Sequence, residues 1–312
     1  MQDSIRQIDP AKTKSVSRRS HASDHRNFVP VDAVSSRPQA SSIAPIAVCY
    51  TPQVPTKLSV TVITRNEASN IGAALASVAW ADEIVVVDSH STDETAAIAR
   101  RHTDRVFVRD WPGYIEQKNH AASLASHDWI LSLDADERVT PALAAEIKAL
   151  LADERRADAF RMPRVTWYLG RWIRTTDWYP DYQLRLYDRR TATWTGRHVH
   201  ETLTVRGVTG QLRGELQHYT YRDLAQHLEK IERYATLAAR QMHEEGKGAG
   251  LLQLACRPPY AFLRNYLFHG GIRDGVAGFI ISCLNACYVF MKYAKLWELD
   301  HRPTESSSSP PA

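Results

Sequence analysis

The chain has 312 residues, of which 44% are hydrophobic and 24% charged, so it can bury the core of an enzyme-sized domain. Its net charge of +4 is too small to indicate nucleic acid as a partner. The four cysteines have no metal-binding spacing, and we expect free thiols in a reducing compartment. We expect no signal peptide, because the apolar stretch 43–49 is too short and begins too late.

Composition divides the chain into four stretches. Residues 1–56 mix Ser, Arg, Pro and Gln without periodicity, which predicts a disordered N-terminal tail. The basic residues of this tail either contact anionic lipid or remain solvated, and we favour the second interpretation. Residues 57–220 are expected to form one α/β domain, residues 221–300 amphipathic helices, and residues 301–312 a second disordered tail.

Strand-like and helix-like segments alternate from Leu58 onward. Four apolar segments are predicted to be strands, at 58–64, 83–87, 105–108 and 129–133. The predicted helices are 70–78, 91–101 with a capping box at its start, 115–125, and one that Thr140 caps and Pro141 begins. This alternation predicts a mostly parallel sheet with helices on both faces. Beyond Leu151 the pattern predicts strands at 159–167 and 183–188 and a hairpin at 194–205.

Acidic side chains follow two of the predicted strands. Asp88 follows one apolar run, and Asp134 and Asp136 follow another. Open α/β sheets bind ligands at the carboxyl ends of their strands, and an Asp-x-Asp sequence there offers hard oxygen ligands for Mg²⁺ or Mn²⁺ shared with substrate phosphates. Taken alone, Asp88 is equally consistent with a helix-entry cap. For Asp134 and Asp136 a metal explains the cost of two charges at the end of a buried strand. The alternative is an ordinary acidic helix entry before Thr140, and the position of the pair after a strand, with Asp88 two strands earlier, favours the metal.

Basic and histidine residues supply further candidates. Lys118 and Asn119 lie in the helix before the Asp-x-Asp strand, and Lys118 either approaches an anion or lies on a solvated helix face. Glu201, beside His200, offers a general base. His218 is either a further metal ligand or a structural histidine.

The C-terminal part of the chain has an unusual composition. Segment 222–245 repeats apolar residues at helical spacing, and segment 258–297 is rich in aromatic residues. Within it, the uncharged run 276–291 is shorter than the roughly 20 residues that span a bilayer. The cations that flank this run are Arg257, Arg264, Arg273, Lys292 and Lys295. This arrangement favours a helix lying in an anionic membrane interface, with a buried core helix as the alternative.

Three segments resemble motifs of family 2 glycosyltransferases of the GT-A fold. They are Val60–Glu67 (VTVITRNE), Val87–Thr95 (VDSxSTDxT) and Leu133–Glu137 (LDADE). Four others are similar to a bacterial subgroup that includes lipopolysaccharide core β-1,4-glucosyltransferases: Gln183–Tyr187, Trp194-x-Gly196, Val199–Glu201 and Gly270–Gly275. The resemblance covers about residues 58 to 298. The first three motifs mark the whole family, whereas the His-Glu pair and the last segment mark the subgroup.

The resemblance implies the GT-A nucleotide-diphospho-sugar transferase fold, a Rossmann-like α/β sheet, and assigns donor-binding roles. The residues that would line the nucleotide pocket are Thr64, Asn66, Glu67 and Asp88, with Asp88 toward uracil. Lys118 and Asn119 would help to hold the donor.

The resemblance also implies metal-binding and catalytic roles. Asp136 would bind Mg²⁺ or Mn²⁺, with His218 as a further candidate ligand, and Asp134 would contact ribose or sugar or join the metal. The usual Glu-Asp catalytic pair of the family is absent as such, and His200-Glu201 stands in that role. Residues 57–220 would be the catalytic domain.

The implied reaction is a single displacement. An acceptor hydroxyl attacks the anomeric carbon, the base takes its proton, and the nucleoside diphosphate leaves, so a UDP-α-sugar yields a β-linkage. The expected donor is a UDP-sugar, with glucose favoured. The expected acceptor is the lipopolysaccharide core or another lipid-linked or envelope glycan, and the expected location is the cytoplasmic face of the inner membrane, without crossing it.

Three other functions compete with this one. A polyprenyl-phosphate or protein acceptor would leave the chemistry unchanged. A non-catalytic protein that binds nucleotide sugars would not need both aspartates and Glu201. A nucleotidyltransferase would normally have a glycine-rich phosphate loop after the first strand, where this chain has Thr64–Ala68 (TRNEA).

Overall fold

The computed structural model describes residues 56–153, 156–197 and 200–301. The predicted tails lie outside these residues, apart from Thr56 and His301. The strands are β1 (Leu58–Thr64), β2 (Glu83–Asp88), β3 (Val106–Val108), β4 (Trp129–Asp134), β5 (Glu137–Val139), β6 (Ala159–Tyr168), β7 (Arg171–Ile173), β8 (Asp181–Asp188), β9 (Ala192–Arg197), β10 (His200–Val205), β11 (Thr209–Gln211) and β12 (Leu216–His218). The helices are α1 (Ile71–Ala76), α2 (Thr95–Ala99), α3 (Tyr114–Leu124), α4 (Pro141–Leu151), α5 (Leu224–Glu244), α6 (Leu251–Leu263) and α7 (Gly275–His301), with short turns η1 (Thr176–Trp178), η2 (Arg264–Phe268) and η3 (Gly271–Asp274).

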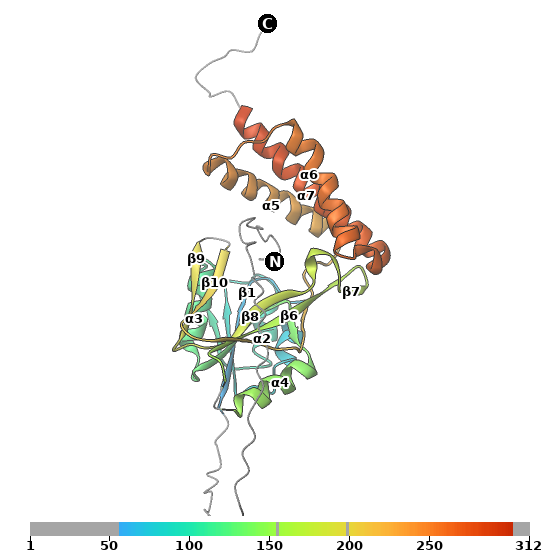
Figure 1. The fold of residues 1–312 in the computed structure, drawn as a ribbon. Helices are drawn as coiled ribbons and strands as arrows, with labels where there is room; N and C mark the ends of the chain where they lie inside the picture. Colours follow the sequence, from blue (N-terminus) through green and yellow to red (C-terminus); the bar gives the residue numbers. More distant parts are fainter. Residues whose placement is uncertain (1–55, 154–155, 198–199, 302–312) are drawn as a thin grey trace, which may run out of the picture. The chain divides into compact units, whose positions relative to one another are not determined.

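A ten-stranded mixed sheet forms the centre of the described α/β domain (Figure 1). Its strands follow the order β3-β2-β1-β4-β8-β6-β12-β5, and β7 and β11 pair with β6. The first four strands are parallel, as the alternating pattern predicted. β8 runs antiparallel to both of its neighbours, so the second half of the sheet is mixed. The β9–β10 hairpin forms a separate two-stranded sheet, as predicted.

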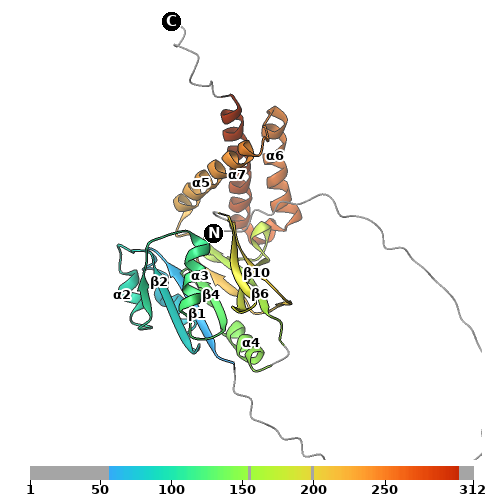
Figure 2. The same ribbon diagram turned by 90° about the vertical axis from the view of Figure 1, so that its left-hand side faces the viewer.

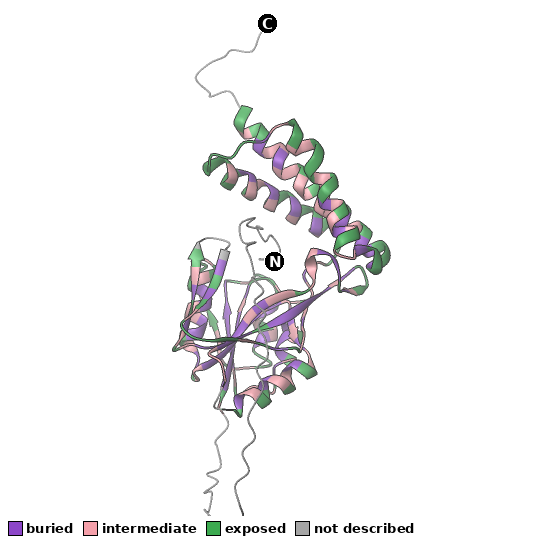
Figure 3. Ribbon diagram, in the orientation of Figure 1, coloured by how far each residue is buried: buried purple, intermediate pink, exposed green. Residues whose placement is uncertain are grey.

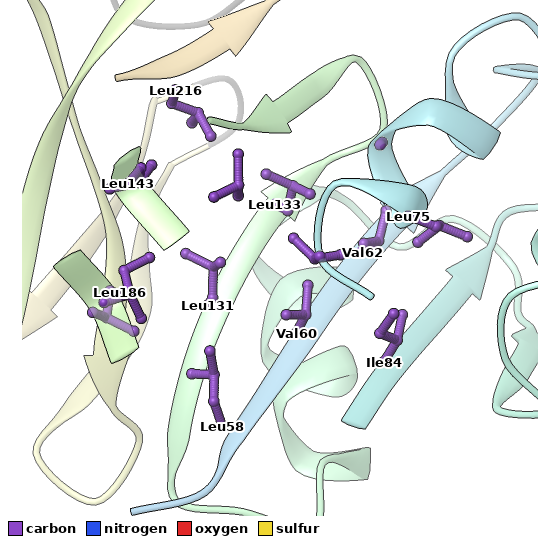
Figure 4. Close-up of a cluster of buried hydrophobic side chains, with 14 of the residues drawn as sticks. Leu58, Val60, Val62, Leu75, Ile84, Leu131, Leu133, Leu143, Leu186 and Leu216 are labelled. Carbon is purple, nitrogen blue, oxygen red and sulfur yellow. The ribbon is translucent and has the colours of Figure 1, made fainter. Parts of the chain in front are cut away.

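The central strands divide their side chains between two faces, because successive residues of a strand point in opposite directions. Leu131 and Leu133 of β4 pack with residues of α1 and α4 (Figure 4). Ile130, which directly precedes Leu131 and points to the opposite face, belongs to a second cluster with Trp194 and Leu203 of the hairpin. The hairpin is therefore fixed to the face of the sheet opposite α1 and α4, and β9 contacts α3 there.

The helix after β2 is shorter than predicted, and its predicted capping box is wrong. α2 begins at Thr95, whose backbone N–H donates to the Asp93 carboxylate at 3.0 Å. Ser91, the expected cap, donates its hydroxyl to Asp88 at the end of β2. The Ser91 hydroxyl therefore binds the carboxylate at the end of β2 and does not cap α2. Thr140, in contrast, caps α4 through its side chain as predicted.

Three long helices follow the sheet. α5 agrees with the predicted amphipathic helix and buries one stripe of side chains that includes Ile231 and Ala235. α6 contains Pro258 and Pro259 and continues directly into the π-helical turn η2. α7 packs against both α5 and α6 (Figure 2). Many residues of α6 and α7 are exposed (Figure 3). They include three free cysteines, Cys256, Cys283 and Cys287.

α7 is longer than the apolar run in the sequence suggested. The helix continues past the run 276–291 through Lys292 and Lys295 to His301. Together, η3 and α7 form a helical stretch, residues 271–301, that is long and apolar enough to cross a membrane by length and composition. The expectation that length alone rules out crossing is therefore wrong.

Candidate active site

Three carboxylates gather where the parallel strands end. β1 lies between β2 and β4, with Thr64 opposite Asp88 and Ile63 opposite Asp134 in the two registers. Asp136 follows in the turn between β4 and β5. Because parallel strands end at the same edge of a sheet, these side chains come to one edge, as the sequence predicted.

The loops after β1 and β2 hold each other in place. The Asp88 carboxylate is buried and accepts hydrogen bonds from the backbone N–H and the hydroxyl of Ser91. Asn66 has a left-handed backbone (φ 55°), and its side-chain oxygen accepts the N–H of Thr92 at 2.8 Å. Thr64 Oγ1 is buried and has no hydrogen-bond partner among the described residues. A polar group of a bound ligand would satisfy this hydroxyl, whose burial is otherwise unfavourable.

Lys118 of α3 bridges two carboxylates. Its Nζ lies 3.1 Å from Glu201 Oε1 and 3.3 Å from Asp134 Oδ1, and 4.5 Å from the centre of the Trp194 ring. The side chains of Lys118 and Glu201 are only 2% and 3% exposed, so the alternative of a solvated helix face is wrong for this lysine. Glu201 and Leu203 point to the same face of β10, and packing of Leu203 in the core therefore directs Glu201 inward.

Two buried arginines complete the ion network. Arg185 of β8 contacts Asp134 and lies 2.9 Å from Glu137, and Arg164 of β6 lies 3.0 Å from Glu137 and 2.6 Å from Asp181. Burial opposes the ionised form of Asp134, but Arg185 and the α3 lysine outweigh it and hold its pKa well below the usual range. Both oxygens of Asp134 are thus engaged by cations. These arginines and Glu137 are members of the site that were not predicted from the sequence.

Asp136 pairs with His218 of β12. Its Oδ2 lies 3.3 Å from His218 Nε2, and the adjacent residue, Tyr219, donates its backbone N–H to the Asp136 carbonyl at 2.9 Å. Burial, and then the charge of Arg164, lower the pKa of His218, so the imidazole is neutral near pH 7 and donates from Nε2. Burial opposes ionisation of Asp136, but its interaction with His218 lowers the pKa of the carboxyl below its ordinary value.

The donor set around Asp136 suits a hard divalent cation only in part. Among the described residues, no three His, Cys, Asp or Glu side chains are grouped to hold a metal ion. Mg²⁺ in enzymes commonly takes one or two carboxylates, with substrate phosphates and water as its other ligands. Asp136 fits that pattern, with His218 orienting it, whereas Asp134 is held by Lys118 and Arg185.

Glu67 and helix α5 border the same region. Burial raises the pKa of Glu67, and the negative charge of Asp136 raises it further, against a 2.9 Å hydrogen bond from Asn70. Burial lowers the pKa of Lys230 on α5, against the charges of Asp136 and Glu67. Lys230 Nζ donates to the carbonyl of Thr220 at 3.0 Å, and Thr220 follows His218 and Tyr219, which both contact Asp136, so this helix lies beside the acidic edge of the sheet. A place for α5 at the site was not predicted from the sequence.

The remaining predicted residues have different surroundings. Asn119 is bound to the hairpin: its Nδ2 donates to the Trp194 carbonyl at 2.9 Å, and its Oδ1 accepts the Trp194 N–H at 3.0 Å. Asn119 therefore fixes β9 on α3. His200 begins β10, but its side chain lies outside the described part of the structure.

Known proteins resemble the chain along most of its described length. The model of glycosyl transferase family 2 matches residues 59–212. The lipopolysaccharide core biosynthesis glycosyltransferase LpsC of Rhizobium meliloti is 33% identical over 254 residues, which are 79% of this chain and 93% of the relative. An uncharacterized glycosyltransferase of Rickettsia typhi is 30% identical over 255 residues, 78% of this chain and 87% of the relative.

Two solved structures align with part of the chain. S. aureus TarS in complex with UDP aligns over 39% of this chain and 41% of its own, with 26% identity and a TM-score of 0.33. Glucosyl-3-phosphoglycerate synthase from Mycobacterium tuberculosis, in complex with Mn²⁺, UDP-glucose and phosphoglyceric acid, aligns over 63% of this chain and 83% of its own, with 19% identity and a TM-score of 0.43. The sheet order, the acidic strand ends and the two curated relatives agree, and the chain is a glycosyltransferase that belongs to glycosyl transferase family 2.

Proposed function

We propose that the enzyme transfers a hexose, with glucose as the first candidate, from a UDP-sugar to a lipopolysaccharide-core or other envelope glycan with inversion at the anomeric carbon. The pairing of Glu201 with Lys118 beside Asp134 carries this proposal, because it places a buried carboxylate at the edge where donors bind in open α/β sheets. The name of the Rhizobium relative supports the lipopolysaccharide core as the acceptor class.

Glu201 has the properties of a general base. Lys118 holds its Oε1, whereas its Oε2 is buried and has no hydrogen-bond partner among the described residues. An acceptor hydroxyl can donate to Oε2 and transfer its proton there as its oxygen attacks the anomeric carbon. The nucleoside diphosphate leaves from the opposite side of that carbon, and the configuration inverts. Lys118 fixes the direction in which the carboxylate faces.

Asp136 would hold Mg²⁺ or Mn²⁺, with His218 orienting its carboxylate through the Nε2–H donor. When bound, the cation would offset the negative charge of the departing diphosphate. The nucleoside would be surrounded by Thr64, Asn66, Glu67 and Asp88. Among these, the buried Thr64 hydroxyl has no hydrogen-bond partner in the described residues, and a bound nucleoside would supply one.

We further propose that the enzyme acts at the cytoplasmic face of the inner membrane. α6, η2, η3 and α7 expose large apolar side chains: Leu251, Leu252, Tyr260, Phe268, Ile272, Val276, Phe279 and Phe290. Arg257 and Arg273 lie exposed among them. An exposed apolar surface with cations between its side chains suits anionic lipid, and a lipid-linked acceptor would lie on the same membrane surface.

The packing of α7 argues against a membrane span. Its first half buries Ala277 and Ile281 against Tyr168 and Ile173 of the β6–β7 hairpin. Asp274, just before α7, is buried and accepts hydrogen bonds from Thr175 at 2.6 Å and from the backbone N–H of Arg174 at 3.1 Å.

The second half of α7 is held by α5. Leu296 packs with Ala239, and Lys295 pairs with Glu232 at 2.9 Å. If α7 crossed the bilayer, it would draw the charged helix α5 into the hydrocarbon region, where unpaired charges are costly. We therefore propose that α6 and α7 lie in the interface.

Hydrolysis of the donor tests the chemistry directly. Purified full-length protein is incubated with a panel of nucleotide sugars and Mn²⁺, and release of the nucleoside diphosphate is measured. We expect UDP-sugars, UDP-glucose first, to be turned over and GDP- and CMP-sugars to be left intact. Turnover of a donor with another nucleotide, or turnover unchanged by excess chelator, would contradict the UDP or the metal part of the proposal. An acceptor panel with polyprenyl phosphate as one arm then separates the acceptor classes.

A further inference from the structure

Lys230 of α5 is a half-buried cation without a carboxylate partner among the described residues. Its Nζ donates to the backbone carbonyl of Thr220 at 3.0 Å, lies 3.5 Å from the Thr220 hydroxyl and stands 4.8 Å from the centre of the Tyr221 ring. An ammonium group has three N–H donors, so at least one remains for another acceptor. Partial burial of a cation that no described carboxylate contacts directly is unfavourable, and a bound anion would offset that cost.

The position of Lys230 relates it to the candidate metal residue. Thr220, which holds the ammonium group, lies two residues after His218 and one after Tyr219, and both of these contact Asp136. The charges of Asp136 and Glu67 also act on Lys230. The lysine is therefore fixed beside the carboxylate that would hold a divalent cation.

The next turn of α5 carries a second unpaired cation. Arg233 is exposed and makes no ion pair with a described carboxylate, and Tyr234 beside it is half-buried. Both interact electrostatically with Tyr114 at the start of α3, and Tyr114 in turn interacts with Glu201 and Asp134. Burial, and then Tyr234, Glu201 and Asp134, raise the pKa of Tyr114 to about 12, whereas the charge of Arg233 opposes the rise. Arg233 follows Lys230 by three residues and therefore lies on the same side of α5 as Lys230.

We propose that Lys230 and Arg233 bind the diphosphate of the nucleotide donor, so that α5 forms one wall of the donor site. This inference rests on the proposed function. Residues three apart on a helix lie on one face, so the two cations can contact neighbouring phosphate groups. Lys118 and Arg185 are already engaged by Asp134 and Glu201 at the edge of the sheet, and a single divalent cation leaves part of the charge of a diphosphate uncompensated. Lys230 and Arg233 supply the remaining positive charge and stabilise the diphosphate as it leaves.

This assignment changes the functional boundary of the chain. The family match ends at residue 212, before α5 begins. On our inference, the donor site requires α5 as well, and the helical segment both contacts the membrane and completes the site.

Binding of UDP and uridine to the full-length protein tests the inference without depending on turnover. Lys230→Met and Arg233→Gln remove the charges and keep much of the side-chain length. Arg240→Gln, at an exposed position farther along the same helix, is the matched control. Dissociation constants are measured with Mg²⁺ by calorimetry for UDP and by ligand-observed NMR for uridine.

We expect each substitution to weaken UDP binding by roughly 10- to 100-fold, as loss of a charged hydrogen bond does, and the double variant to be weaker still. Uridine affinity and the Arg240→Gln control should stay within about twofold of the wild type. UDP affinity retained in the double variant overturns the inference alone. An equal loss for uridine and UDP overturns it too, because the cations would then support the pocket and not the diphosphate. A wild-type protein that binds no UDP overturns both the UDP donor and this inference.

Discussion

Replacement of Glu201 by glutamine separates its role as a base from its role in holding the fold. Glutamine keeps the size of the side chain and an oxygen that can accept the hydrogen bond from Lys118, which is 3.1 Å long in the native protein. Lys118 also retains Asp134 as a counter-charge at 3.3 Å, so no cation is left unpaired. The change therefore removes a proton acceptor and leaves most of the ion network intact.

The expected magnitudes follow from these contacts. The new amide group would occupy the place of Oε2, which is buried and has no partner among the described residues. An unsatisfied buried amide costs on the order of 1–3 kcal/mol, and we expect that loss in the free energy of unfolding. Loss of a general base typically slows transfer by about 10²–10⁴-fold. UDP affinity should remain within about twofold, since the base acts on the acceptor.

Three measurements on one protein preparation test this reasoning: the single-turnover transfer rate, the dissociation constant for UDP, and urea-induced unfolding. Glu146→Gln is the control, because Glu146 also accepts hydrogen bonds, from the backbone N–H groups of Arg213 and Gly214, but belongs to α4 outside the site. Transfer by Glu201→Gln at the native rate would refute the assignment, and Asp134 or His200 would then be the next candidate base. A large loss of UDP affinity would instead place Glu201 in the donor pocket.

Three further predictions concern the metal, pH and the membrane. Asp136→Ala should abolish metal-dependent turnover while the far-UV circular dichroism stays native, and native rates for this variant or for the wild type in excess chelator would contradict the metal assignment. Burial, and then the charge of Lys230, lower the pKa of His227 to about 4. The free energy of unfolding, measured by urea titration, should therefore fall by about 3 kcal/mol as the pH drops from 6.5 toward 4. If the free energy of unfolding of His227→Gln depends on pH to the same extent, another group is responsible. Phe268→Glu with Val276→Glu should reduce flotation with anionic liposomes at least severalfold, whereas Val208→Glu, at an exposed apolar position of the sheet domain, should not, and equal flotation of all variants would argue against the proposed lipid surface.

The parallel half of the fold could be predicted because local signals agreed with the tertiary structure. The strands from β1 to β4 are apolar runs of strand length separated by helical segments, and their registers bring Asp88 and Asp134 to one edge. Ser91 shows where local reasoning fails. The spacing of Ser91 to Glu94 matches a capping box, but the buried carboxylate of Asp88 competes for the Ser91 hydroxyl. The hydrogen bond to Asp88 forms, and the side-chain cap of α2 does not.

The ion network could have been anticipated only in part. Arg185 stands between Leu184 and Leu186 in a segment predicted to be a strand, and an arginine in such a place needs a buried acidic partner. The sequence does not indicate which acidic residue that is. The partner, Glu137, lies on another strand, 48 residues away, and is brought into contact by the antiparallel half of the sheet.

The position of α5 was beyond local reasoning for a similar physical reason. Its apolar stripe predicts an amphipathic helix, but periodicity does not say which surface the polar residues face. That orientation is set by contacts distant in sequence. The Tyr168 hydroxyl and His227 Nδ1 form a hydrogen bond of 2.7 Å, and the Thr220 carbonyl accepts a hydrogen bond from Lys230. These contacts hold the first turns of α5 against the sheet domain, whereas Glu232 and Ala239 contact α7. Because one helix contacts both the acidic edge and the helix that we assign to the lipid surface, docking of α6 and α7 on a membrane should keep the donor site near that surface, where a lipid-linked acceptor can reach Glu201.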